Sequence, residues 1–521
     1  MRSRGPCALI ILLLSVSASG AVFQYSTPAA TDKAHSEAFL WIPPKARRIR
    51  GAVVGGMTLM ERELVRDGLI RKACADRGLA IVFLKCGLRK VDLQKVLDDL
   101  SELSGYRELS KAPLMFLGHS AGGPQARTLA IKHAARYFGL ILYRGGGPGK
   151  LPPGIPILMM LGQFDEFGGT MRRPDGREPW QGGRDELARF RARNKANLAS
   201  IVVEPGSGHF AWSDRNSAYL AMFIRKAVDA RITADGAVKG IDYRTGWLTN
   251  LTISSSDQPK PAPHAQYASD KSAAAWHFDK EIAEATVAYH AGGFGKVDQF
   301  IKWNDPHWVD AGARFFFTKL DWVGDGQTLQ LHPVYAKAYP GQYNGRGPRW
   351  PDADKPVGSS SALIRIKAVS GPIAAVGGHR IRMEYDALAP AGQGARATFM
   401  AYSPGDRTYR YSERVGMMPR GFAGLKKGKP PKITFPPIRN MKANSPPIKL
   451  NAASDSGLPV EYYVACGPAL IDAGKLAISQ LPVRAKFPIS VKVVAWQFGR
   501  GVEPFVRTAE PVTQTILIKK Q

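Results

Sequence analysis

The residues best suited to chemistry lie in a Gly-x-Ser-x-Gly pattern at residues 118–122, with Ser120 at its centre. A short apolar run, residues 114–117, precedes the pattern, and a helix-compatible run, residues 121–135, follows it. In this order of strand, glycine-flanked serine and helix, the chain turns sharply and lifts a serine hydroxyl above a parallel sheet. The flanking glycines leave room for that turn. Ser120 is therefore the candidate nucleophile.

Two residues downstream have the types and the order that such a serine requires. A serine hydroxyl is a poor nucleophile at neutral pH, and His209, in GSGHF, can accept its proton. Asp165, in GQFDE after an apolar run, can fix the imidazole tautomer and stabilise its charged form. Glu166 is the alternative acid. His119 is interpreted as a supporting residue or part of the pocket wall and not as the base, because adjacent side chains on such a turn diverge.

Acyl transfer at Ser120 would create an oxyanion, which backbone N–H groups stabilise. One expected donor is the residue after the nucleophile, Ala121, and the second is Met57 or Gly56, in the loop after an early strand. Backbone donors need no particular side chain, so only their position identifies them. The sequence shows no metal-ligand spacing, and we expect neither a metal nor a cofactor.

The elements that must position these residues alternate between strands and helices. Apolar runs predict strands at residues 37–42, 49–54, 79–85, 114–117, 138–143, 155–161 and 200–203. Helices are predicted at residues 61–77, 92–103, 121–135, 184–196 and 215–230. Such alternation predicts a doubly wound, mostly parallel sheet with both faces covered.

Residues 22–232 resemble the α/β-hydrolase superfamily, in its secreted esterase and depolymerase branches. The resemblance rests on residues 118–123, on Asp165 after a strand and on His209 before the last helix. It implies a catalytic domain with a Ser-His-Asp triad of Ser120, His209 and Asp165. The implied activity is that of a serine esterase that forms an acyl-enzyme. Residues 55–57 lack the histidine-glycine triplet of many lipases, which leaves the second oxyanion donor open.

The second half of the chain loses the alternation and indicates a multidomain protein with β-sandwich domains. Residues 233–299 predict a connecting or cap region with one short helix within 276–293. Residues 300–425 contain five strand-like runs and predict an antiparallel sandwich as an accessory domain. Four tryptophans in that span are either core residues or a sugar-stacking platform: Trp303, Trp308, Trp322 and Trp350.

Residues 426–521 predict a last domain that begins with a basic linker, since residues 426–449 hold seven Lys or Arg and no acid. From residue 432 the chain resembles bacterial immunoglobulin-like domains. The matching stretches are ITFPPI, SGLPV with Tyr463, GPA, GKL, VKVVAWQFG and VTQTILI. This resemblance implies a spacer or adhesion role without catalysis.

The first 21 residues have the features of a secretory signal peptide: Arg2 and Arg4, an apolar run at 8–14, then small residues. The apolar run is too short for a permanent anchor, although a short anchor is the alternative. We expect a secreted, periplasmic or cell-surface protein with no integral membrane segment after signal removal. Of the four cysteines, Cys74, Cys86 and Cys466 would remain, and no disulfide framework is expected.

The formal net charge is +29, and +27 once Arg2 and Arg4 are removed. This charge favours association with polyanions such as acidic glycans or envelope surfaces, while no nucleic-acid module is recognisable. The leading functional hypothesis is an esterase acting on an acylated polysaccharide or a polyester. The alternatives are a serine peptidase of the prolyl-oligopeptidase type, which lacks a preceding propeller here, and a non-catalytic binding protein on a hydrolase scaffold.

Overall fold

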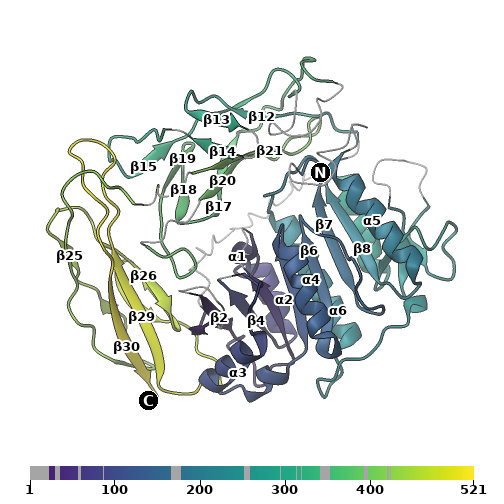
Figure 1. Cartoon of the computed structure of the whole chain (residues 1–521), viewed down its shortest axis with the longest axis horizontal. Coiled ribbons are helices and arrows are strands. Elements are labelled where there is room, and N and C mark those ends of the chain that lie inside the picture. Colours follow the sequence, from purple (N-terminus) through teal and green to yellow (C-terminus); the bar gives the residue numbers. More distant parts are fainter. Residues whose placement is uncertain are drawn as a thin grey trace, which may run out of the picture.

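The computed structural model describes residues 23–29, 36–56, 60–85, 87–165, 178–251, 259–293, 295–311, 314–317, 319–340, 352–391, 397–418, 422 and 424–521. Figure 1 shows three regions of the chain. An α/β region lies at the right, a central β region (residues 295–425) at the top, and a C-terminal β region (residues 426–521) at the left. Residues 1–22, Met57, Cys86, Glu166 and Trp350 lie outside the described residues, so the expectations about them stay predictions.

An eight-stranded sheet organises the α/β region, in the order β1-β2-β4-β3-β5-β6-β7-β8. Its strands are Tyr25–Pro28 (β1), Glu37–Trp41 (β2), Gly51–Gly56 (β3), Leu79–Leu84 (β4), Leu114–His119 (β5), Tyr137–Tyr143 (β6), Ile157–Gly162 (β7) and Ala199–Glu204 (β8). The β1–β2 and β2–β4 pairs are antiparallel, and all other pairs are parallel. The predicted mostly parallel sheet is confirmed, and its strand ends gather the following loops at one edge.

Helices cover both faces of this sheet. One face is covered by α3 (Leu93–Ser104), α4 (Gly122–Lys132) and α5 (Pro179–Arg193), and the other by α2 (Gly68–Asp76) and α6 (Asp214–Arg231). Shorter turns are α1 (Glu61–Leu64), η1 (Arg107–Lys111) and η2 (Ala134–Arg136). The prediction of a single helix at residues 61–77 is wrong, because the structure has two helices there, α1 and α2. Asp67 leaves helical geometry there and caps α2, because its carboxylate accepts from the N–H groups of Leu69 and Ile70 at 2.9 and 3.0 Å.

Residues 233–299 pack on the α/β region. A small sheet, in the order β10-β9-β11, contains Trp247–Thr249 (β9), Ala262–Pro263 (β10) and Ala275–His277 (β11), and a turn, η4, spans Tyr243–Thr245. The predicted short helix is α7 (Lys280–Ala291), whose Ile282 and Tyr289 join the core that α6 also lines. His290 Nε2 accepts the Val203 N–H at 3.0 Å, so α7 is tied to the end of β8.

The described residues of the central β region form three sheets. The largest has the order β13-β14-β21-β20-β17, from Trp308–Ala311 (β13), Arg314–Phe317 (β14), Ser412–Met417 (β21), Thr398–Ser403 (β20) and Arg365–Ser370 (β17). The others contain β15 (Thr328–Gln330), β19 (Arg380–Met383) and β18 (Ile373–Gly377), and β12 (Ile301–Trp303) with β16 (Pro333–Tyr335). Most strand pairs are antiparallel, as expected, but β14 and β21 pair in parallel, and so does the isolated bridge between Val297 and Tyr409.

The described tryptophans of this region do not form an open platform. Trp303 is buried at 7% exposure and its ring lies 5.9 Å from that of Trp308 and 5.5 Å from that of Phe399. Trp322 packs on Phe498 of the C-terminal β region, with ring centroids 5.7 Å apart. These contacts favour the core interpretation over sugar stacking.

The C-terminal β region has two larger sheets around one apolar core. The first has the order β23-β30-β29-β26, from Met441–Lys442 (β23), Val512–Lys519 (β30), Ile489–Trp496 (β29) and Glu461–Cys466 (β26). The second contains Ile448–Lys449 (β24), Lys475–Ile478 (β28) and Ala469–Asp472 (β27), beside a short pair of Ile433–Thr434 (β22) and Ala453–Ser454 (β25). Cys466 of β26, like Cys74 of α2, is buried and unpaired, and burial raises the pKa of the Cys74 thiol to about 12.

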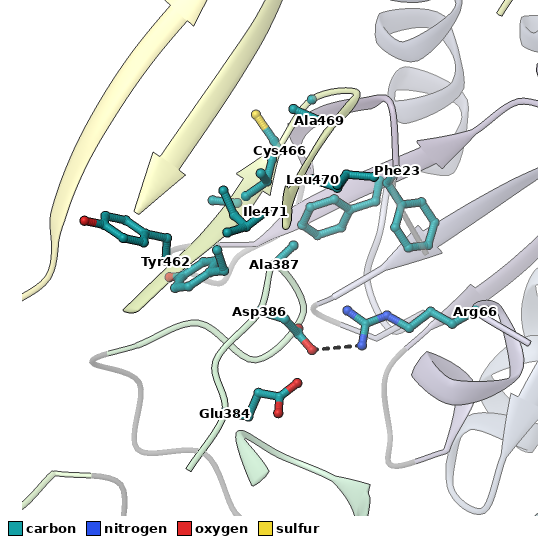
Figure 2. Close-up of a pocket in the computed structure, with 15 residues that line it drawn as sticks. Phe23, Arg66, Glu384, Asp386, Ala387, Tyr462, Cys466, Ala469, Leu470 and Ile471 are labelled. Carbon is teal, nitrogen blue, oxygen red and sulfur yellow. Dashed lines mark hydrogen bonds and ion pairs between the residues drawn. The ribbon is translucent and has the colours of Figure 1, made fainter. Parts of the chain in front are cut away.

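The three regions meet at a cavity of about 230 Å³ beside the first strands of the large sheet. Figure 2 shows its walls, with Phe23 from the α/β region, Leu470 and Ile471 from β27, and Asp386 facing Arg66 at 2.8 Å. The C-terminal β region is also joined to the α/β region by an ion pair between Arg484 and Glu108 at 3.0 Å. The C-terminal β region therefore packs directly against the α/β region.

Buried neutral histidines make the stability of this fold sensitive to acid. Burial lowers the pKa of His277 to about 3 and that of His290 to about 4. An unfolded histidine titrates near about 6.5, so the unfolded chain binds more protons between about pH 6.5 and about pH 4. The free energy of unfolding therefore falls as the pH falls through this window, by about 2 kcal/mol per histidine at pH 5.

Urea unfolding at pH 7.5 and pH 5.0 tests this expectation on the wild-type protein and on His277→Gln. Glutamine can keep a hydrogen bond to Thr249 Oγ1, which lies 2.8 Å from His277 Nε2. The variant should lose about 2 kcal/mol less than the wild type between the two pH values. Equal losses in the two proteins would contradict the assignment.

Candidate active site

Ser120 lies on a sharp turn between β5 and α4. Its φ is +53°, a left-handed backbone conformation that is strained for a residue other than glycine. The turn is held because Ser120 N–H donates to Tyr143 O at 3.1 Å and Ser120 O accepts from Gly123 N–H at 3.0 Å. A Cβ at Gly118 would lie only 2.3 Å from Gly122 O, so the tight approach requires glycine there. Ser120 itself is only partly buried.

Asp165 and His209 meet at the same edge of the sheet, although 44 residues separate them in sequence. Asp165 follows β7 and His209 follows β8. His209 Nδ1 lies 2.9 Å from Asp165 Oδ1 and 3.0 Å from Oδ2, and both side chains are nearly buried, at 3% and 7% exposure. A carboxylate accepts only, so His209 Nδ1 carries a proton and donates it to Asp165.

His119 joins the serine turn to the histidine loop. Its Nε2–H donates to His209 O at 3.0 Å, and its ring centroid lies 4.7 Å from that of His209. Complete burial, with His209 as a neighbour, lowers the pKa of His119 well below its usual value, so the ring stays neutral. The His119 N–H donates to Glu61 Oε1 at 2.8 Å. His119 thus has the supporting position that its sequence neighbourhood indicated.

The structure describes two of the three expected oxyanion donors, Ala121 and Gly56. Ala121 is the N-cap residue of α4, where backbone N–H groups have no intrahelical acceptor. Gly56 is the last residue of β3, the strand paired with β5 in the sheet. The loop that contains Met57 is outside the described part of the chain. The second donor therefore stays a prediction.

A buried polar network lies behind these loops, and the sequence did not indicate it. Arg144, directly after β6, pairs with Glu204, the last residue of β8, and both are buried. Asn216 of α6 donates through Nδ2 to Glu204 Oε2 and to Tyr143 Oη, each at 2.9 Å. Burial alone would lower the pKa of Arg144, but Tyr143 and Glu204 raise it above its usual value.

The central β region packs directly on the loops that carry the candidate residues. Met60, which precedes α1, and Phe210, which follows His209, are fully buried in one cluster with side chains from β17, β20 and β21: Val369, Met400, Val415 and Met417. Lys367 Nζ donates to Trp212 O at 2.6 Å and lies 4.0 Å from the centre of the Trp212 ring. The histidine loop is thus covered by strands from more than 150 residues further along the chain.

Two further observations concern the described ranges of the chain alone. No group of three or more His, Cys, Asp or Glu side chains there could hold a metal ion. No helix there has the length and apolar character needed to cross a membrane.

The strand order and the serine turn after β5 define an α/β-hydrolase fold. No protein-family model matches the chain, and no curated protein matches it. Among solved structures, an S-formylglutathione hydrolase from Agrobacterium tumefaciens is similar over 39% of this chain and 93% of its own, with 15% identity and a TM-score of 0.30. A thermostable carboxyl esterase from Bacillus coagulans is similar over 40% and 99%, with 16% identity and a TM-score of 0.30. Est1E from Butyrivibrio proteoclasticus is similar over 39% and 100%, with 13% identity and a TM-score of 0.27.

The Arg144–Glu204 pair should be far more important for stability than a surface pair. Glu204→Gln would leave the charge of Arg144 buried without compensation, at a cost of about 3–5 kcal/mol. Asp229→Asn is the matched control, because it breaks the Arg77–Asp229 pair, which is exposed at 31% and 50%. That change should cost less than about 1 kcal/mol. Similar losses for the two variants in urea unfolding would show that Arg144 needs no buried partner.

Proposed function

We propose that this protein is a serine hydrolase that cleaves carboxylic esters through Ser120, His209 and Asp165. The observation that carries the proposal is the contact of His209 Nδ1 with both carboxylate oxygens of Asp165, on loops at the sheet edge where the strained Ser120 turn lies. This contact fixes the tautomer in which Nδ1 carries the proton and Nε2 is the nitrogen that acts as the base. A histidine and an acid in this arrangement supply what a serine nucleophile needs.

In the proposed reaction, Ser120 Oγ attacks the ester carbonyl carbon and His209 Nε2 accepts the hydroxyl proton. The oxyanion accepts hydrogen bonds from Ala121 N–H and from a second N–H at Gly56 or Met57. Collapse of the intermediate breaks the bond to the alcohol, which leaves with the proton from His209. Water then loses a proton to His209 and attacks the acyl-enzyme, and the acid is released as Ser120 regains its proton.

The proposal extends to an exported protein that acts on an acylated polysaccharide or a polyester. A serine peptidase and a non-catalytic binding protein remain the alternatives. The paired acid and histidine argue against loss of catalysis, because a binding scaffold has no need for a buried carboxylate against an imidazole.

Substitutions at the three residues test the proposal. Ser120→Ala should lower the turnover of a simple aryl ester by about 10⁶-fold and Asp165→Asn by about 10⁴-fold, since the nucleophile or the correct tautomer is lost. The control is Ser272→Ala, at an exposed serine, which should leave turnover unchanged. Full hydrolysis by purified Ser120→Ala would overturn the proposal.

A panel of acetyl, feruloyl and glucuronoyl esters, polyesters and peptide amides separates the two catalytic alternatives. An ester hydrolase should cleave at least one ester class in a Ser120-dependent way. Preferential cleavage of amides would replace the ester proposal with the peptidase.

Retention on acidic polysaccharide is the remaining part of the proposal. The seven basic residues at 426–449 are exposed, and none of them forms an ion pair with another described residue: Lys426, Lys427, Lys429, Lys432, Arg439, Lys442 and Lys449. Lys442 lies opposite Lys519 and Lys449 opposite Lys475 in neighbouring strands. Like charges at such positions repel each other, and a polyanion would relieve the repulsion.

Replacing Lys442, Lys449 and Lys519 by Gln should lower the salt concentration at which the protein elutes from a heparin column, because fewer counterions are released on binding. The control replaces Lys45, Lys132 and Lys239, which are exposed elsewhere, by Gln. Hydrolysis of a small soluble ester should be unchanged in both. Identical elution of the two variants would contradict a localised anion-binding surface.

A further inference from the structure

Gln163 joins the acid loop, the histidine loop and the central β region. It lies two residues before Asp165 and is 7% exposed. Its Oε1 accepts from Gly206 N–H, three residues before His209, at 2.9 Å and from Arg410 Nη1 at 2.7 Å. Its Nε2 donates to Glu178 Oε1 at 2.9 Å. Both loops of the proposed triad therefore depend on one amide side chain, and the central β region supplies one of its partners.

Arg410 is itself held firmly within the central β region. It forms an ion pair with Asp298, its backbone N–H donates to Val297 O at 3.1 Å, and its O accepts from Gln299 Nε2 at 2.7 Å. Its guanidinium carbon lies 4.9 Å from the centre of the Phe164 ring, one residue before Asp165. Burial lowers the pKa of Arg410 to about 10, which leaves it charged at neutral pH.

The histidine loop and the central β region also make a close backbone contact, at Gly206. Gly206 has a φ of +74°, and a Cβ built on it would lie 2.0 Å from Tyr411 O. The histidine loop therefore lies directly against the residue that follows Arg410. The two loops are also joined to each other, because Phe164 N–H donates to Ser207 O at 2.8 Å.

We propose that Arg410 is a positioning residue for the proposed triad, acting through Gln163 to hold the Asp165 and His209 loops in register. The inference rests on the proposed function and extends it, because it assigns to the central β region a part in the active site itself. Arg410 touches no reacting atom. Its effect follows from geometry, since a displacement of about 1 Å between catalytic groups can cost about 10²-fold in rate.

The test compares Arg410→Met, Arg410→Lys and Arg407→Met in the full chain. Methionine keeps much of the side-chain length and removes the donors, lysine restores a charged donor, and Arg407 is an exposed arginine in the preceding turn. Arg410→Met should lower kcat on an aryl ester by about 10-fold to 100-fold with little change in KM. Arg410→Lys should recover part of the loss, and Arg407→Met should match the wild type.

Hydrogen exchange gives a readout that does not need a substrate. The Gly206 and Phe164 amides should exchange faster in Arg410→Met than in the wild type, because the bridge through Gln163 is weakened. If Arg410→Met does not fold, Gln163→Met removes the same bridge from the other side. Faster exchange in a protein that hydrolyses no ester would reject the proposed function and keep the positioning role. Wild-type kcat and wild-type exchange in Arg410→Met would overturn the inference.

Discussion

The buried ion pair between Arg144 and Glu204 is the interaction on which the geometry at the sheet edge depends. Removing two charges from water is costly, and the pair is tolerable because the Asn216 amide donates a hydrogen bond to the Glu204 carboxylate and another to Tyr143 Oη, which ties the pair to β6. These groups come from the ends of β6 and β8 and from α6, so one network fixes the strand ends on either side of β7. The Asp165 and His209 loops start from those fixed ends.

Local patterns were sufficient to predict the mostly parallel part of the sheet, although not its first strand, β1. Strand ends in a parallel sheet lie at one edge, so a serine after β5, an acid after β7 and a histidine after β8 had to be neighbours once the alternation was recognised. The strained turn at Ser120 could also be predicted, because the sequence has a glycine at position 118, where the backbone passes too close to Gly122 O for any other residue. The prediction failed where a side chain overrode periodicity, as when Asp67 capped α2 and ended the helix.

The partners of these residues could not be predicted, since they are far apart in sequence and carry no periodic signal. Arg144 and Glu204 are 60 residues apart, and Arg410 and Gln163 are 247 apart. Each is an ordinary polar residue at the end of an apolar run or in a turn. The one available signal was a charged residue directly after a buried strand, as at Arg144 after β6 and Glu204 at the end of β8. Such a residue must find a partner if it stays buried.

The same contacts change how the second half of the chain should be understood. A binding module that merely delivers a catalytic domain to a polymer would be joined to it by a small polar interface. Here the apolar core of the α/β region continues into the C-terminal β region, and Met60 and Phe210 are buried by side chains of the central β region. Without that covering, the loop that carries His209 would expose apolar surface and lose Lys367 as a partner, and Gln163, before Asp165, would lose Arg410. The β regions are therefore part of the structure that makes the candidate site.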